Sequence, residues 1–113
     1  MSDTFRTRER GEELRFKMSQ EIQFKAEARR NRLLGEWLAH KFGLTTDEAD
    51  AYVKEVIASD LEEPGIEDVV RKVMKDIEDR GAGISEDEVR AEMDRLFAVA
   101  SEKVKQDFKS DSI

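Results

Sequence analysis

The 113-residue sequence contains no cysteine, a single proline and a single histidine. The absence of cysteine excludes disulfides, thiolate catalysis and cysteine-based zinc sites. With one proline and six glycines, few positions interrupt a helix, which favours an all-helical chain. Hydrophobic residues make up 38% and charged residues 42%, so the core must be small and the surface heavily charged.

Long apolar runs are also missing. No stretch approaches the roughly 20 apolar residues that a membrane span needs. The N-terminal "MSDTFRTRER" is polar throughout and lacks the apolar stretch of a signal peptide. The length fits one domain, and the simplest expectation is a soluble, cytoplasmic protein without direct membrane insertion.

The net charge of −7 is unevenly distributed. Residues 1–41 hold ten basic and seven acidic side chains, whereas residues 42–113 hold ten basic and twenty acidic ones. A basic front and an acidic rear suggest that the two parts face different surroundings. The negative overall balance argues against a nucleic-acid partner.

Three amphipathic helices are predicted in the second half. Thr45 with Glu48, and Ser85 with Glu88, have the spacing of capping boxes that begin helices. Pro64 suits the first turn of the helix between them, and Gly81 or Gly83 can end that helix. The apolar stripes at helical spacing are Ala49, Tyr52, Val53, Val56 and Ile57; Ile66, Val69, Val70, Val73, Met74 and Ile77; Val89, Met93, Leu96, Phe97, Ala100 and Val104.

A longer helix is predicted ahead of these three, over residues 21–43 and ending at Gly43. Its expected apolar face comprises Ile22, Ala26, Leu33 and Trp37, with Leu34 and Leu38 beside it. Trp37 is expected to be a core anchor. The short connections favour antiparallel neighbours, so the fold class is an all-α four-helix bundle.

Residues 1–18 differ from the rest. Phe5 and Phe16 are three helical turns apart, but Glu9 and Glu12 lie between them on that face. Gly11 costs a helix about 1 kcal/mol relative to alanine, and a short isolated helix is marginal in water. We expect a mobile or partly helical N-terminal arm at 1–18 that merges into the bundle of 19–113. From composition alone, a frayed terminus without a partner is the simpler interpretation.

The sequence offers little for catalysis or metal binding. His40 lies near a predicted helix end, where a surface or capping role is the usual one. The many carboxylates fall on the solvent sides of the helices. The stretch "DIEDRGAGISEDE" fails as a calcium loop because it lacks the final glutamate. We therefore expect no enzyme, no catalytic residues and no metal site.

The basic run around "EARRNRLLGEW" allows two interpretations. Arg29, Arg30 and Arg32 could bind a phosphate, such as that of a nucleotide, although no glycine-rich loop accompanies them. The plainer interpretation is a solvated helix face on which Glu36 pairs with Arg32.

Several stretches resemble one known family. "FKAEARRNRLLGEWLA" (24–39) is similar to the signature of the zeta-type ATPase inhibitor family of alphaproteobacteria. "YVKEVIASDLEEPGIEDVVRKVMKDI" (52–77), "ISEDEVRAEMDRLFAVA" (84–100) and "FRTRERGEELRFKM" (5–18) also resemble this family. The resemblance covers nearly the whole chain.

The resemblance implies a small four-helix protein that binds the catalytic head of the F-type ATP synthase and suppresses ATP hydrolysis. Its N-terminal segment would insert as a helix between catalytic and rotor subunits and block rotation, which places the protein at the cytoplasmic face of the membrane. The free protein would be a monomer. The implied partner-binding residues are Phe5, Arg6, Arg8, Glu9, Arg10, Glu12, Glu13 and Phe16.

Under this interpretation an arm poor in apolar residues becomes ordered only on meeting a groove. The resemblance also implies weak binding of adenine nucleotide, at residues that it does not assign. Two alternatives stay open: a regulatory or scaffolding bundle that does not inhibit, and a weak adenine-nucleotide sensor that uses Arg29, Arg30 and Arg32. No other cofactor is expected.

Overall fold

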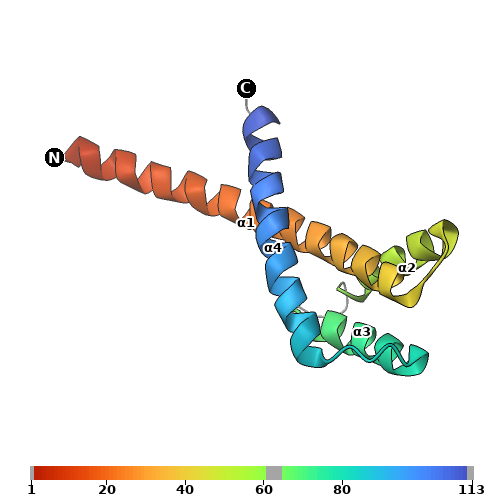
Figure 1. The fold of residues 1–113 in the computed structure, drawn as a ribbon. Helices are drawn as coiled ribbons and strands as arrows, with labels where there is room; N and C mark the ends of the chain where they lie inside the picture. The colour runs from red at the N-terminus through yellow and green to blue at the C-terminus, as the bar shows by residue number, and fades with distance from the viewer. Residues whose placement is uncertain (1, 61–64, 112–113) are drawn as a thin grey trace.

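The computed structural model describes residues 2–60 and 65–111, with side chains for 20–60 and 65–108. Every element in this part of the chain is helical: α1 (Ser2–Phe42), α2 (Thr46–Ser59), α3 (Glu67–Arg80) and α4 (Glu86–Asp111). Figure 1 shows α1 extending far beyond the other helices at its N-terminal end, which gives the molecule a length of 63 Å against 27 and 22 Å. The prediction of an all-α, four-helix protein is confirmed.

The arm and the first bundle helix form one continuous α1. Its backbone is helical from Ser2 onward, and Gly11 does not interrupt it. Of the two expected forms of the arm, mobile or partly helical, the structure has a helical one. The arm also continues into the rest of α1, as predicted. That it frays in the free protein stays a prediction.

Helix ends follow the predicted signals. The Thr45 hydroxyl accepts a hydrogen bond from the Glu48 N–H, and the Glu48 carboxylate accepts one from the Thr45 N–H. The Ser85 hydroxyl accepts a bond from the Glu88 N–H at 3.1 Å. Gly81 ends α3 in the left-handed conformation, with φ of 61°. Pro64 lies outside the described residues, and α3 begins three positions later, at Glu67.

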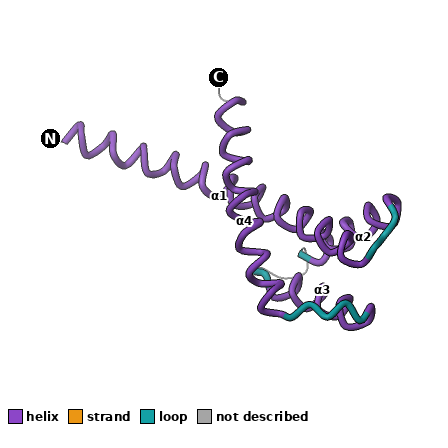
Figure 2. The backbone as a smooth tube through the Cα atoms, in the orientation of Figure 1, coloured by secondary structure: helices purple, strands orange, loops and turns teal. Residues whose placement is uncertain are grey.

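The main core lies between the C-terminal half of α1 and the other three helices. Figure 2 shows α2 running back along α1 after a short turn. In this view α3 and the start of α4 lie below α1 and α2. Apart from Ala39, the predicted apolar positions supply this core; its buried members are Leu34, Leu38, Ala39, Tyr52, Val56, Val69, Val70, Val73, Ile77, Val89, Met93 and Leu96.

The predicted apolar face of α1 is rotated relative to the observed one. Leu34 and Leu38 are completely buried, whereas Leu33 and Trp37 are only partly buried. The expectation that Trp37 is a core anchor is therefore wrong. Its ring packs at the margin of the core, with the Lys41 ammonium 5.8 Å from the ring centroid. Aliphatic side chains one position further on fill the interior instead.

A second, smaller core forms where α4 crosses α1 at a steep angle (Figure 1). Ala26 and Ala100 are completely buried there and Val104 nearly so, with Ile22 and Phe97 packed around them. Alanines allow the two helix backbones to approach closely. This crossing separates the projecting part of α1 from the main bundle.

Candidate functional site

The projecting arm carries the predicted partner-binding residues. Their backbone belongs to α1, so positions 5, 9, 12 and 16 share one face of a helix. Their side chains lie outside the described part, as do those of the other predicted contacts: Arg6, Arg8, Arg10 and Glu13. Among the side chains that are described, Ile22 is the first of α1 to pack against another helix.

The crossing of α1 and α4 fixes the base of the arm. Besides the alanine contact, the Arg29 guanidinium lies 3.6 Å from the Asp107 carboxylate of α4. Lys103 lies 3.4 Å from the same carboxylate group. These exposed ion pairs add little energy, but they sit beside a dry contact that holds α4 across α1. The arm therefore emerges from a defined point of the bundle.

The three arginines of the basic run diverge. Arg29 faces α4, whereas Arg32 is exposed and its Nε lies 3.3 Å from Glu36 Oε1, as expected for the solvated interpretation. Arg30 is 5% exposed and belongs to the interior, so the solvated-face interpretation is wrong for this residue. The three guanidinium groups do not converge on one point. Weak nucleotide binding stays a prediction without a site.

Arg30 is held by several groups in the interior. Its Nε and Nη2 donate to Asn31 Oδ1 at 3.1 and 3.0 Å, and the guanidinium lies 5.8 Å from the Phe97 ring centroid. Burial lowers the pKa of Arg30, while the carboxylates of Asp60, Glu27 and Asp94 oppose that change. Arginine stays protonated in proteins, so Arg30 is a positive charge shared by α1, α2 and α4.

Three buried polar residues were not predicted from the sequence: Arg30, Asn31 and Asp68. Asn31 is completely buried, and its Nδ2 has no hydrogen-bond partner within the described structure. Asp68, at the start of α3, is 7% exposed and binds Arg71 Nη1 at 3.0 Å. One signal was available: Arg30 precedes Leu34 and Leu38 at helical spacing, which places it on the buried face.

Other candidates for chemistry are weak. His40 is exposed in the last turn of α1, consistent with the expected surface role. In the described part of the chain, no group of three or more potential ligand side chains could hold a metal ion. No helix there is long and apolar enough to cross a bilayer.

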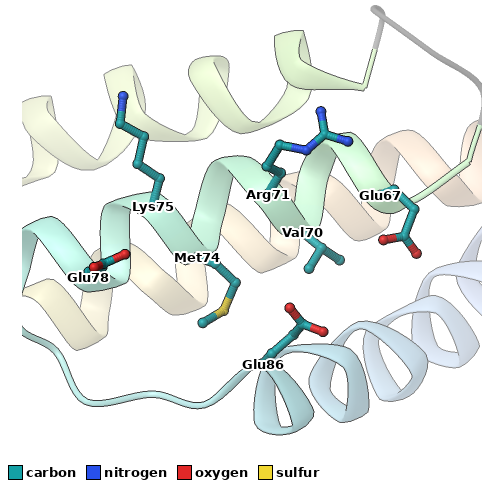
Figure 3. Close-up of a pocket in the computed structure, with 7 residues that line it drawn as sticks. All are labelled: Glu67, Val70, Arg71, Met74, Lys75, Glu78 and Glu86. Atoms are coloured by element: carbon teal, nitrogen blue, oxygen red, sulfur yellow. The ribbon is translucent and has the colours of Figure 1, made fainter.

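A shallow cleft of about 380 Å³ lies between α3 and the start of α4 (Figure 3). Val70 and Met74 point into it, and Glu67 and Glu86 stand at one end. Both of these carboxylates bind Arg90, at 3.0 and 3.2 Å. The cleft contains none of the predicted site residues, and both carboxylates at its acidic end are already paired with Arg90.

Comparison with known proteins adds a decisive observation. The sequence model of the family described as ATPase inhibitor subunit zeta matches residues 1–110. The chain belongs to this family. The resemblance identified from the sequence is thus confirmed, and the family supports a regulatory role as an inhibitor.

A solved relative supports the fold. A protein whose structure was determined by solution NMR is 48% identical, with a TM-score of 0.66. The alignment covers 76% of this chain and 98% of that one. None of the curated proteins matches the chain.

Proposed function

We propose that this zeta-family protein inhibits ATP hydrolysis by the F-type ATP synthase by inserting the N-terminal part of α1 into its catalytic head. The observation that carries the proposal is the length of α1. This helix has 41 residues, yet its described packing against other helices begins only at Ile22. Figure 1 shows the N-terminal part of α1 projecting away from α2, α3 and α4 as a single helix.

The geometry suits a plug. Residues 2–18 form about 25 Å of helix at 1.5 Å per residue, enough to reach deep into a cleft between subunits. A single helix is narrow, whereas the crossing of α4 over α1 makes the molecule abruptly wider (Figure 1). The wide part would stop insertion, and the arm, residues 1–18, would block rotation of the central rotor against the catalytic subunits.

Charge and apolar content fit the same mechanism. The arm alternates arginine and glutamate, whose pairing with the walls of a cleft fixes register more than it adds affinity. Phe5 and Phe16 would supply the apolar anchors. Folding of the arm costs less if it is already helical when it meets the partner, because less conformational entropy is lost on binding.

The test is ATP hydrolysis by a purified cognate catalytic head, titrated with the full chain and with a variant lacking residues 2–18. We expect inhibition by the full chain and none by the truncated one. Thermal unfolding of both should be similar, because the described core begins at Ile22. A full-length variant with Phe5→Ala and Phe16→Ala should inhibit weakly, which separates loss of contacts from loss of the segment.

Two results would contradict the proposal. Full inhibition by the truncated variant would place the activity in the bundle of residues 19–113. Absence of inhibition by the full chain, with binding to the head retained, would favour the regulatory or scaffolding alternative.

A further inference from the structure

One large aromatic side chain outside the arm is left uncovered. Phe24 of α1 is 71% exposed, whereas Phe42 and Phe97 are packed against the two cores. Val99 of α4, at 50%, is the other strongly exposed large hydrophobic residue among those described. An exposed valine is ordinary on a charged surface, but a phenylalanine ring with most of its area in water is a typical interface anchor.

The position of Phe24 explains why no helix covers it. Phe24 precedes Asn31 by seven residues and Gly35 by eleven, so all three lie on one face of α1. α2 covers this face at Gly35, where Val53 is in contact, and α2 ends at Ser59, near Arg30. Phe24 lies about 10 Å further along the helix axis than Asn31, beyond the end of α2.

The polar neighbours of Phe24 are engaged with one another. Lys25 pairs with Glu21 at 3.9 Å, and Gln23 Nε2 donates to Glu27 Oε1 at 3.2 Å. Because these polar groups are paired along the helix, the Phe24 ring is the group on this face that remains for contact with a partner. The ring is also on the same uninterrupted helix as the arm, only eight residues after Phe16.

We infer that Phe24 is the outer anchor of the same interface as the arm, and that it enters an apolar pocket at the mouth of the cleft in the catalytic head. This inference rests on the proposed function. Phe16 and Phe24 are eight residues apart, which is about 12 Å along the helix axis. The rim of a cleft that encloses the helical arm would therefore contact Phe24. The partner-binding surface would then extend past residue 18 to the edge of the bundle.

The test compares three full-length variants for their dissociation constant with the purified cognate head and for inhibition of its ATP hydrolysis. Phe24→Ala should weaken both by about tenfold or more, the loss expected for an aromatic anchor. Phe24→Leu should recover most of the affinity, because it restores apolar volume. Val99→Ala, the matched control on α4, should change neither quantity by more than about twofold.

Thermal unfolding separates this role from a structural one. Because the Phe24 ring is mostly in water, the midpoint for Phe24→Ala should equal that of the unsubstituted protein. A lowered midpoint together with weaker inhibition would assign the ring to folding and overturn the inference.

The remaining outcomes distinguish the two proposals. If the full chain inhibits and Phe24→Ala inhibits equally, the inference fails while the proposed function stands. If the full chain does not bind the head, both fail. If sedimentation shows that the free protein self-associates and that Phe24→Ala makes it monomeric without altering binding to the head, the ring is covered by a second copy, and the inference is overturned.

Discussion

Gly35 of α1 packs directly against the backbone of α2 at Val53. A Cβ atom at position 35 would lie 3.0 Å from Val53 Cα and 3.2 Å from its Cγ2. Helices approach this closely only where one of them lacks a side chain. Gly35 therefore sets the distance between α1 and α2, and with it the space that Leu34 and Leu38 fill.

Gly35→Ala is expected to destabilise the protein, although alanine is the better helix former by about 1 kcal/mol. The added methyl group meets backbone, which cannot rotate away, so the helices must separate. We expect a net loss of about 1–2 kcal/mol in the free energy of unfolding, measured by urea denaturation.

A double-mutant cycle with Val53→Ala checks the cause of that loss. Removing the Val53 methyl groups gives the new Cβ some room, so the combined loss should be smaller than the sum of the two single losses. Additive losses would mean that the new Cβ is obstructed by the Val53 backbone alone and not by its side chain.

Arg30→Ala tests whether the buried arginine joins the helices. The substitution removes two hydrogen bonds to Asn31 Oδ1 and leaves the nearby Asp60 carboxylate without its main opposing charge. We expect a loss of about 2–4 kcal/mol in unfolding free energy by chemical denaturation. Arg32→Ala, two positions away and exposed, should cost less than about 0.5 kcal/mol. Equal effects of the two substitutions would show that burial of Arg30 is unimportant.

Much of this fold is predictable from local signals. The capping pair Thr45 and Glu48, the left-handed Gly81 and the stripe from Val69 to Ile77 all depend on nearest neighbours along the chain, and all are found as predicted. The family of the chain was also recognised from its sequence, and the sequence model of that family confirms it.

The burial of several side chains could not be predicted, because it depends on how the helices pack against one another. Arg30 and Asn31 look like surface residues because their types usually are. The spacing of Arg30 from Leu34 and Leu38 places it on the buried face of α1, but the burial of both residues depends on how α2 and α4 lie around α1. The helical spacing of Trp37 with Ile22, Ala26 and Leu33 predicts a core position, yet a rotation of the buried face leaves the Trp37 ring at the margin. The exposure of Phe24 likewise follows from the position at which α2 ends. The spacing of apolar residues along α1 does not predict that position.

Ala100→Leu tests the small core at the base of the arm. Ala100 is completely buried against Ala26, so three added carbon atoms must push α4 away from α1. We expect unfolding free energy to fall by about 1–3 kcal/mol, as overpacking usually costs. Ala98→Leu, on the exposed side of the same helix, should leave stability within about 0.5 kcal/mol of the unsubstituted protein. If Ala100→Leu is equally neutral in thermal unfolding, the crossing is not closely packed.

The stability of the protein at alkaline pH should depend on Tyr52, the one tyrosine of the chain. Its hydroxyl donates to Asp76 Oδ2 at 2.8 Å, beside Lys72. Burial raises the pKa of the Tyr52 phenol far above its ordinary value, and the hydrogen bond to Asp76 raises it further. The folded protein therefore keeps the phenol protonated at a pH where the unfolded chain releases the proton.

The stabilisation by Tyr52 is complete below the ordinary tyrosine pKa of about 10 and is lost progressively as pH rises above it. Because only one tyrosine can ionise, the phenolate absorbance near 295 nm should appear together with loss of the helical circular dichroism signal, and not before. Tyr52→Phe should be less stable by about 1 kcal/mol at neutral pH, because it removes one hydrogen bond. That variant should also lose less stability on going to pH 11. Phenolate absorbance that rises near pH 10 while the protein is still helical would show that the Tyr52 hydroxyl is accessible to water and would contradict its buried bond to Asp76.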